Sequence, residues 1–397
     1  MNKSVIIDAV RTPIGKLGGG LKDVLVDELA AKVMTGLFER TSLPKELVDE
    51  VILGQAKQSA DSSNLARLSL LRANFPIETS GYTIHRQCGS GLQAINSADL
   101  QIQHGLDEVI VAGGAESMST APYYLRHARF GYRSGNGVLL DPNTESQPYS
   151  QPIEEYGYLT MGETAENLAE QYQIERSEQD EFSLRSQELA NKAINDGRFD
   201  SQLIPYEVIS KKNTTLFQKD EHPRNTSLEQ LSHLKPVFKK DGTVTAGNAS
   251  GRNDAASVLL MTSESTAKKY DLTPKSRIIA QASVGVSPEY MGIGPVYSTK
   301  KALAQCGLSI SDIGLIELNE AFAAQSIAVI RELALDINKI NVNGGAIALG
   351  HPIGATGAIL ATKLIHEMER QGTKYGIVTL CTAGGQGITT IFENLQV

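Results

Sequence analysis

Cys88 is the first residue whose type and surroundings suggest chemistry. It opens the run C-G-S-G after a short extended segment, Gly81 to Arg86, and an apolar pattern of helical period follows until Gly105. The pattern predicts a strand, a sharp turn and a helix, with the cysteine at the turn. Free N–H groups and positive potential at the helix amino terminus favour a thiolate, the reactive form of cysteine. A small buried cysteine at a strand end fits the same stretch equally well.

A glycine-rich loop farther along the chain carries His351. The loop reads N-G-G-A-I-A-L-G-H-P-I-G-A-T-G from Asn343 to Gly357, and a helix is expected to follow it to about Arg370. Glycines allow a backbone to approach a ligand closely, and a helix amino terminus favours negative charge. A lone histidine is more often structural, but so glycine-rich a loop does not need a ring for packing, which favours a functional role. The spacing is not the dinucleotide-binding pattern G-x-G-x-x-G.

Two more polar residues follow predicted strands. Asn319 comes after the strand Leu315 to Leu318 and is expected to open a helix, at the sheet edge where α/β proteins bind ligands. A plain helix cap is the alternative role for this asparagine. Cys381 ends the strand Gly376 to Leu380 and begins C-T-A-G-G-Q-G, which core packing does not explain. Cys306, within a helical pattern, is taken as a plain residue.

Composition excludes several classes of function. The net charge of -8 argues against a nucleic-acid partner, and the amino terminus lacks an apolar run long enough for a signal peptide or a membrane span. Three cysteines in 397 residues cannot form a disulfide framework, so a reducing compartment, the cytoplasm, is expected. The seven histidines are scattered without ligand spacing, so no metal is expected, and neither G-x-x-x-x-G-K-[ST] nor G-x-S-x-G occurs.

The chain begins with α/β material. Short β-branched runs alternate with amphipathic helices, which predicts a largely parallel, buried sheet. Residues 120–245 differ in composition and contain Arg- and Gly-rich loops and a Pro/Ser/Gln stretch. Two polar helices are expected there, the second from a cap at Ser177 to about Gly197. This segment is interpreted as an insertion packed on the main body. The first elements are a strand at Ser4 to Val10, a helix at Asp27 to Arg40, a strand at Glu50 to Gly54, the Cys88 unit and a strand at Glu108 to Ala112.

After Gly251 the alternation of predicted strands and helices resumes in the same order, shifted by 264 to 272 residues. Four elements recur: Ser4-Val-Ile-Ile as Ser276-Arg-Ile-Ile, Val51-Ile-Leu as Leu315-Ile-Glu, Gly91-Leu-Gln-Ala-Ile as Gly357-Ala-Ile-Leu-Ala, and Val109-Ile-Val as Gly376-Ile-Val-Thr. A duplication into two α/β halves about a pseudo-twofold axis is favoured, although matches this short also arise by chance. The expected halves are residues 1–119 with 246–272, and residues 273–397.

Taken together, Cys88, His351, Asn319 and Cys381 resemble the reactive residues of the thiolases, and the resemblance covers nearly the whole chain. The motifs that carry it, in order, are C-G-S-G at Cys88, A-E-S-M-S at Ala115, M-G-E-T-A-E-N at Met161, T-A-G-N-A-S-G-R-N-D at Thr245, M-G-I-G-P at Met291, N-E-A-F-A at Asn319, the His351 loop and the Cys381 loop. The resemblance implies a thiolase fold, an α/β fold with α-β-α-β-α layers. It also implies that the insertion, residues 120–245, is a loop domain that binds coenzyme A.

The implied activity is a reversible Claisen condensation of two acetyl-CoA to acetoacetyl-CoA and coenzyme A, by ping-pong chemistry through an acyl-cysteine. Cys88 would be the nucleophile with His351 as its base, and Cys381 would remove and later return a proton at the second substrate. His351, with a water held by Asn319, would stabilise the enolate, and the N–H groups of Cys88 and Ala383 the other oxyanion. No cofactor is implied beyond coenzyme A and acyl-CoA as substrates. A homodimer or homotetramer is expected.

The resemblance also assigns the substrate contacts. Ser250 and Met161 would line the pantetheine channel, and Met291 and Phe322 the acyl pocket, although both methionines also fit as core filler. Arg224 and three lysines of the insertion form a basic rim that could orient the phosphates of an acidic substrate on an acidic protein. The lysines are Lys211, Lys212 and Lys219.

Several positions depart from the family pattern. Thr382 and Ala383 stand where glycine and apolar residues are usual, and a positive φ at Ala383 would cost about 1 kcal/mol. Thr160 replaces a histidine frequent in short-chain members, His85 an asparagine, and Ala255 a glycine. These departures leave the reaction type intact and bear on acyl-chain length and rate.

Three alternative functions follow from these observations. A degradative 3-ketoacyl-CoA thiolase with longer substrates has the same reactive residues. A decarboxylating ketoacyl synthase also uses a reactive cysteine, but the second cysteine, Cys381, argues against that class. A catalytically inactive acyl-CoA binding protein would account for Thr382 and Ala383, and the retention of all four reactive residues argues against it.

Overall fold

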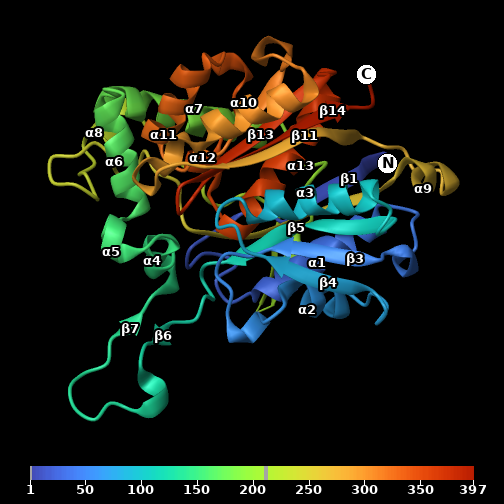
Figure 1. The fold of residues 1–397 in the computed structure, drawn as a ribbon, viewed down its shortest axis with the longest axis horizontal. Helices are drawn as coiled ribbons and strands as arrows, with labels where there is room; N and C mark the ends of the chain where they lie inside the picture. Colours follow the sequence, from blue (N-terminus) through green and yellow to red (C-terminus); the bar gives the residue numbers. More distant parts are fainter. Residues whose placement is uncertain (1, 210–212) are drawn as a thin grey trace.

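The computed structural model describes residues 2–209 and 213–397, which form two α/β halves with a long insertion between them (Figure 1). The first half contains β1 (Ser4–Arg11), α1 (Val26–Glu39), β3 (Glu50–Gly54), α2 (Leu65–Arg72), β4 (Ser80–Ile84), α3 (Ser90–Gln103), β5 (Val109–Ser117) and β10 (Asn253–Ser263). The second half contains β11 (Ser276–Gly285), α10 (Gly294–Cys306), β12 (Leu315–Leu318), α11 (Ala323–Leu333), α12 (Ala346–Leu349), α13 (Ile353–Gln371), β13 (Tyr375–Thr382) and β14 (Gln386–Asn394).

The strand order repeats between the halves, which confirms the predicted duplication. The first half is ordered β1-β10-β5-β3-β4 and the second β11-β14-β13-β12, so that β1 corresponds to β11, β5 to β13 and β3 to β12. The helices α3 and α13 occupy equivalent places after β4 and β12. The two halves join edge to edge where Ile6 of β1 pairs with Ser276 of β11. The strands of both halves therefore form one ten-stranded sheet, which includes the short β2 (Gly15–Lys16).

The prediction of a largely parallel sheet is wrong. The pairs β3–β4, β3–β5 and β12–β13 are parallel, whereas β1–β10, β10–β5, β11–β14 and β13–β14 are antiparallel. The sequence pattern reports burial on both faces of a strand, and β1, β5 and β10 are buried along their whole length in either direction. Strand direction depends instead on connections, such as the tight turn that makes β13 and β14 a hairpin.

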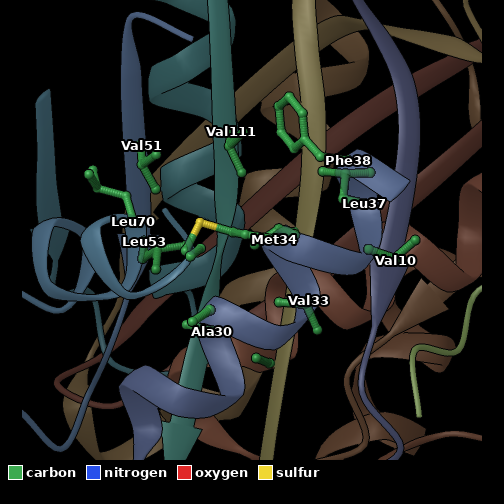
Figure 2. Close-up of a cluster of buried hydrophobic side chains, with 14 of the residues drawn as sticks. Val10, Ala30, Val33, Met34, Leu37, Phe38, Val51, Leu53, Leu70 and Val111 are labelled. Carbon is green, nitrogen blue, oxygen red and sulfur yellow. The ribbon is translucent and has the colours of Figure 1, made fainter. Parts of the chain in front are cut away.

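The layers follow the predicted order. Helices α1 and α2 cover the outer face of the strands of the first half, where Met34, Leu37, Val51 and Val111 belong to one buried cluster (Figure 2). A second cluster includes α3 and α13 and strands of both halves, and a third packs α10 and α11 against the outer face of the strands of the second half (Figure 1).

Glycines bring the two central helices together. A Cβ on Gly357 of α13 would lie 2.4 Å from the backbone nitrogen of Leu92 in α3, and a Cβ on Gly91 would lie 2.9 Å from the carbonyl oxygen of Gly354. Such distances are too short for any side chain, so the repeated glycine of the two halves is required for close approach. The amino termini of α3 and α13, which carry Cys88 and His351, are therefore held side by side.

The insertion forms helices that cover the second half and an arm that leaves the body. Its helices are α4 (Pro142–Glu145), α5 (Ile153–Tyr156), α6 (Met161–Gln171), α7 (Arg176–Asn195) and α8 (Leu228–Ser232), and α6 and α7 pack against α11. The expected cap of α7 at Ser177 is wrong, because Glu175 precedes the first turn and accepts the N–H of Gln179 through its carbonyl. The short pair β6 (Tyr124–Leu125) and β7 (Leu139–Leu140) projects away from the molecule (Figure 1).

The division of the chain after residues 119, 245 and 272 stays a prediction. In the part of the chain that the structure describes, no helix combines the length and apolar character needed to cross a membrane.

Candidate active site

The turn between β4 and α3 places Cys88 at the start of a helix, as predicted. Gln87, the residue before it, has a φ of +45°, an uncommon value for a residue with a side chain. Ser90 ties the turn together, since its Oγ donates to the Gln87 carbonyl at 2.6 Å and accepts the Arg86 N–H at 2.9 Å. Cys88 is 8% exposed and belongs to a small buried cluster with Ala56, Met118 and Ile353. The strained turn therefore holds the thiol in one place.

The His351 ring has one defined tautomer. Its Nδ1 lies 2.6 Å from Thr356 Oγ1, and that hydroxyl donates its own hydrogen to the Pro352 carbonyl at 2.9 Å. Thr356 can therefore only accept from the ring, so Nδ1 carries the proton and Nε2 is an open acceptor. Nε2 is buried and has no hydrogen-bond partner among the described residues. The backbone N–H of His351 donates to Asn253 Oδ1 at 2.9 Å, which fixes the loop.

Burial keeps Cys88 and His351 neutral. It raises the pKa of the Cys88 thiol to about 11, against the opposing effects of the Ala383 N–H and the Lys57 ammonium. Burial lowers the pKa of His351 to about 4, and the charge of Lys57 adds to that effect. Burial therefore opposes the helix terminus, which was expected to favour the thiolate of Cys88. The pair can react by transferring the thiol proton to Nε2 as a substrate is attacked.

Cys381 comes from the other half and is completely buried near Cys88. It is the second last residue of β13 and packs in one cluster with Met291 and Phe322. Burial raises the pKa of the Cys381 thiol, and an ionised Cys88 would raise that pKa further. The two thiols therefore interact electrostatically across the boundary between the halves.

Asn319 is not a helix cap. Helix α11 begins at Ala323 with Phe322 at the cap position, so the prediction that Asn319 opens the helix is wrong. The side chain of Asn319 is fully buried, and neither amide atom has a hydrogen-bond partner among the described residues. Such a group costs about 1–3 kcal/mol when it stays unpaired, which indicates a ligand-binding role.

The turn after Cys381 needs positive φ at its glycines and not at Ala383. Gly384 and Gly385 have φ values of +83° and +77°, whereas Ala383 is not among the residues of positive φ in the described chain. The substitution therefore carries no backbone strain. The backbone N–H groups of Ala383 and of Cys88 itself both act to lower the pKa of the Cys88 thiol.

A cavity of about 370 Å³ joins most of the predicted residues. Its wall includes Cys88 and His351 together with four predicted substrate contacts, which are Met161, Ser250, Met291 and Phe322. Among the described residues, no group of three or more His, Cys, Asp or Glu side chains is arranged to hold a metal ion. The cavity is thus a partly open, largely apolar space with a thiol and a free imidazole nitrogen on its wall.

The predicted basic rim is only partly at this cavity. Arg224 is exposed outside the lining, and its charge acts on His222, whose ring packs over Gly251 of the cavity wall. Lys219 lies in a separate groove beside Phe199. Lys211 and Lys212 lie outside the described residues.

Glu116 joins the loops of both halves, although its place in the sequence suggested no role. Its Oε2 accepts the N–H of Ala56 at 3.0 Å and the N–H of Gly354, at the start of α13, at 2.8 Å, while Oε1 accepts the N–H of Lys57 at 3.0 Å. A glutamate inside an otherwise buried strand was the available signal, because such a group needs several donors. Thr356 and Asn253 were also missed, although both lie inside the quoted motifs.

These features define an enzyme class. Models of the thiolase family match the chain at residues 4–265 (thiolase, N-terminal domain) and at residues 272–394 (thiolase, C-terminal domain). The chain therefore belongs to the thiolase family and has the thiolase fold.

Individual relatives match over the full length. The chain is 45% identical to an acetyl-CoA acetyltransferase of Syntrophomonas wolfei, with 98% of this chain and 99% of the relative covered. Its structure is similar to that of the Bacillus anthracis acetyl-CoA acetyltransferase, with a TM-score of 0.97, 49% identity and coverage of 100% and 99%. It is also similar to human mitochondrial 3-ketoacyl-CoA thiolase in complex with CoA, with a TM-score of 0.94, 44% identity and coverage of 99% and 98%.

Proposed function

We propose that the protein is an acetyl-CoA C-acetyltransferase that converts two acetyl-CoA into acetoacetyl-CoA and coenzyme A, reversibly. The observation that carries the proposal is the bare Nε2 of His351 on the wall of the same cavity as the Cys88 thiol. The full-length relatives named acetyl-CoA acetyltransferase support the choice of substrate.

In the first half-reaction Cys88 attacks the thioester carbon of acetyl-CoA. Its proton passes to Nε2 of His351, the carbon–sulfur bond to coenzyme A breaks, and the departing thiolate takes that proton. The N–H groups of Cys88 and Ala383, which both favour negative charge on Sγ, are assigned to hold the oxyanion. Because the Cys88 thiol has a pKa of about 11, the transfer to His351 accompanies the attack and does not precede it.

In the second half-reaction the Cys381 proton first passes to Nε2 of His351, and the Cys381 thiolate then removes the α-proton of a second acetyl-CoA. The enolate oxygen is held by the N–H now on Nε2 of His351 and by a water on Asn319, whose amide has no other partner among the described residues. The enolate carbon attacks the acetyl group on Cys88, the bond from that group to the Cys88 sulfur breaks, and the released sulfur takes the proton from Nε2 of His351. In the reverse direction Cys381 protonates the leaving carbon.

The substrate contacts follow the cavity. We assign Ser250 and Met161 to the pantetheine arm, and Met291 and Phe322 to the acyl group, because all four line the space beside Cys88. Arg224 is assigned to a phosphate of coenzyme A, as an exposed cation near the cavity wall. Coenzyme A and acyl-CoA are the proposed ligands, with no cofactor.

Chain length distinguishes this activity from that of a 3-ketoacyl-CoA thiolase with longer substrates. Thr160, where short-chain members often have histidine, is the cap of α6, and its Oγ1 and N–H both bond Glu163. It therefore adds no free polar group to the acyl end of the cavity. A panel of 3-ketoacyl-CoA substrates of rising length tests this point, and a maximum at acetoacetyl-CoA is expected.

A homodimer or homotetramer is proposed for the assembly. The projecting arm, residues 121–140, exposes apolar side chains, including Phe130 at 93%, Val138 at 68% and Leu139 at 64%. Contiguous exposed apolar groups mark an interaction surface in a chain of this kind. The cytoplasmic location expected from the cysteine content stays a prediction.

The test uses acetoacetyl-CoA with free coenzyme A, followed by detection of acetyl-CoA and of an acetyl group on the Cys88 peptide by mass spectrometry. Replacement of Cys88 by alanine is expected to abolish both signals. Cys306→Ala is the matched control, because that half-buried thiol on α10 is bonded only within its own helix in the structure. An acetyl group that is absent from the wild-type Cys88 peptide would refute the proposal.

A further inference from the structure

Lys57 is a buried cation beside Cys88 that the proposed mechanism does not use. The residue is 5% exposed, and it follows Ala56, which belongs to the same buried cluster as Cys88. Its backbone N–H is fixed by Glu116, the carboxylate that also holds the start of α13 near His351. The position of Lys57 is thus tied to both loops that carry the reacting groups.

The Lys57 ammonium donates to two neutral oxygens. It bonds Ser146 Oγ, and it lies 3.2 Å from Oε1 of Gln147, which lines the same cavity as Cys88. Gln87, the residue before Cys88, reaches the same segment, since its Nε2 donates to Ser150 Oγ at 2.8 Å. Lys57 and the nucleophile turn are therefore anchored on one segment, residues 146–150. A buried ammonium needs negative charge nearby, and the groups that act on Lys57 in this way are Glu116 first and then an ionised Cys88.

The other ionisable groups around Cys88 do not supply this positive charge. His351 is neutral, with a pKa lowered to about 4, and the buried thiol of Cys381 has a raised pKa. The carboxylate of Glu116 is negative when ionised and opposes a thiolate. Arg252 and Asp141 form an ion pair at 3.8 Å, and their charges act on Lys57 in opposite directions. His85, on the turn itself, is also neutral because burial lowers its pKa.

We propose that Lys57 is a positioning residue for the reaction proposed above, whose ammonium stabilises the negative charge that develops on the Cys88 sulfur. No bond to Lys57 forms or breaks. Charge appears on the sulfur as its proton moves to His351 and again when the acyl group leaves, and a buried cation acts on it through a medium of low dielectric. Lys57 therefore favours both entry into and exit from the acyl-cysteine.

The test measures how fast iodoacetamide alkylates Cys88 in the full chain, by mass spectrometry of the Cys88 peptide between pH 7 and 9. Alkylation requires the thiolate, so the rate reports the fraction of ionised Cys88. Lys57→Met and Lys57→Gln are expected to slow alkylation about tenfold at each pH, as for a rise of about one in the pKa of Cys88. Lys57→Arg keeps the charge and should stay within about threefold of wild type.

Two matched variants separate charge from structure. Ser146→Ala removes a hydrogen-bond partner of Lys57 and keeps the charge, and Lys45→Met removes a half-buried lysine that bonds the Ala73 carbonyl in a remote part of the first half. Both should alkylate at the wild-type rate. The inference is overturned if the two neutral variants of Lys57 react within twofold of wild type, or if Ser146→Ala slows the reaction as much as they do.

Failure of this inference differs from failure of the proposed function. The alkylation rates need no acyl-CoA, so an effect of Lys57 is measurable even in a chain that forms no acetyl-Cys88. Conversely, normal acetyl transfer by Lys57→Met with unchanged alkylation would leave the proposed function intact and remove the role of Lys57.

Discussion

Replacement of Thr356 by valine should slow acetylation of Cys88 by about tenfold to a hundredfold. Thr356 Oγ1 is the acceptor that keeps the proton of His351 on Nδ1, because its own hydrogen is committed to the Pro352 carbonyl. Valine has the same shape without the acceptor, so a buried Nδ1–H would be left unpaired at a cost of about 1–3 kcal/mol. The ring then favours the tautomer with hydrogen on Nε2, which cannot accept the thiol proton. A cost of that size lowers the competent fraction by the stated factor.

Rapid mixing with acetyl-CoA, an acid quench and mass spectrometry of the Cys88 peptide give the acetylation rate directly. Thr362→Val is the matched control, since Thr362 is a buried threonine on the same helix whose Oγ1 lies 2.9 Å from Ser257 Oγ. Both variants lose one buried hydrogen bond and should lose similar stability, but only Thr356→Val should lose acetylation rate. An acetylation rate for Thr356→Val within threefold of wild type would refute the tautomer assignment.

Other predictions address the remaining residues. Cys381→Ala should still form acetyl-Cys88 from acetyl-CoA but fail to make acetoacetyl-CoA, and equal loss of both steps would contradict the assigned roles. Asn319→Ala should lower turnover by about a hundredfold to a thousandfold. A turnover near that of wild type would mean that Asn319 has only a packing role. The acetylation rate of wild type should be nearly flat from pH 6 to 9, because the pKa values of about 4 for His351 and about 11 for Cys88 bracket that range. A tenfold rise per pH unit would instead mean that free thiolate is the reactive form. Gly357→Ala should destabilise the fold by about 1–3 kcal/mol in urea unfolding, since its Cβ would lie 2.4 Å from a backbone nitrogen of α3; an unchanged midpoint would refute the close-packing argument.

Local patterns were sufficient for the elements that carry chemistry but not for how those elements meet. The strand, turn and helix around Cys88 are encoded within one short stretch, and β3 was predicted with its observed bounds. The start of α11 was misplaced because Asn319 has the residue type of a cap but is drawn into the site, bonding the Thr379 carbonyl through its own N–H. The prediction of strand direction was also wrong, because burial on both faces of a strand is compatible with either direction.

The supporting residues were hidden for a different physical reason. Glu116 and Lys57 act through partners 238 and 89 residues away, Gly354 and Ser146, and no local periodicity encodes such contacts. Their only trace in the sequence is a charged side chain where the pattern demands burial. A charged residue inside an apolar predicted strand, or beside a reactive cysteine, therefore indicates buried partners elsewhere in the chain, because an unpaired charge there would be too costly.

The electrostatic coupling of the two cysteines gives the proposed reaction an order. Negative charge on Cys88 raises the pKa of Cys381, so the two thiols cannot both be ionised at low cost. Once Cys88 carries an acetyl group it can no longer be charged, and this contribution to the pKa of Cys381 disappears. At the stage when a second acetyl-CoA must lose its proton, burial, the larger cause of the raised pKa of Cys381, is therefore the one that remains.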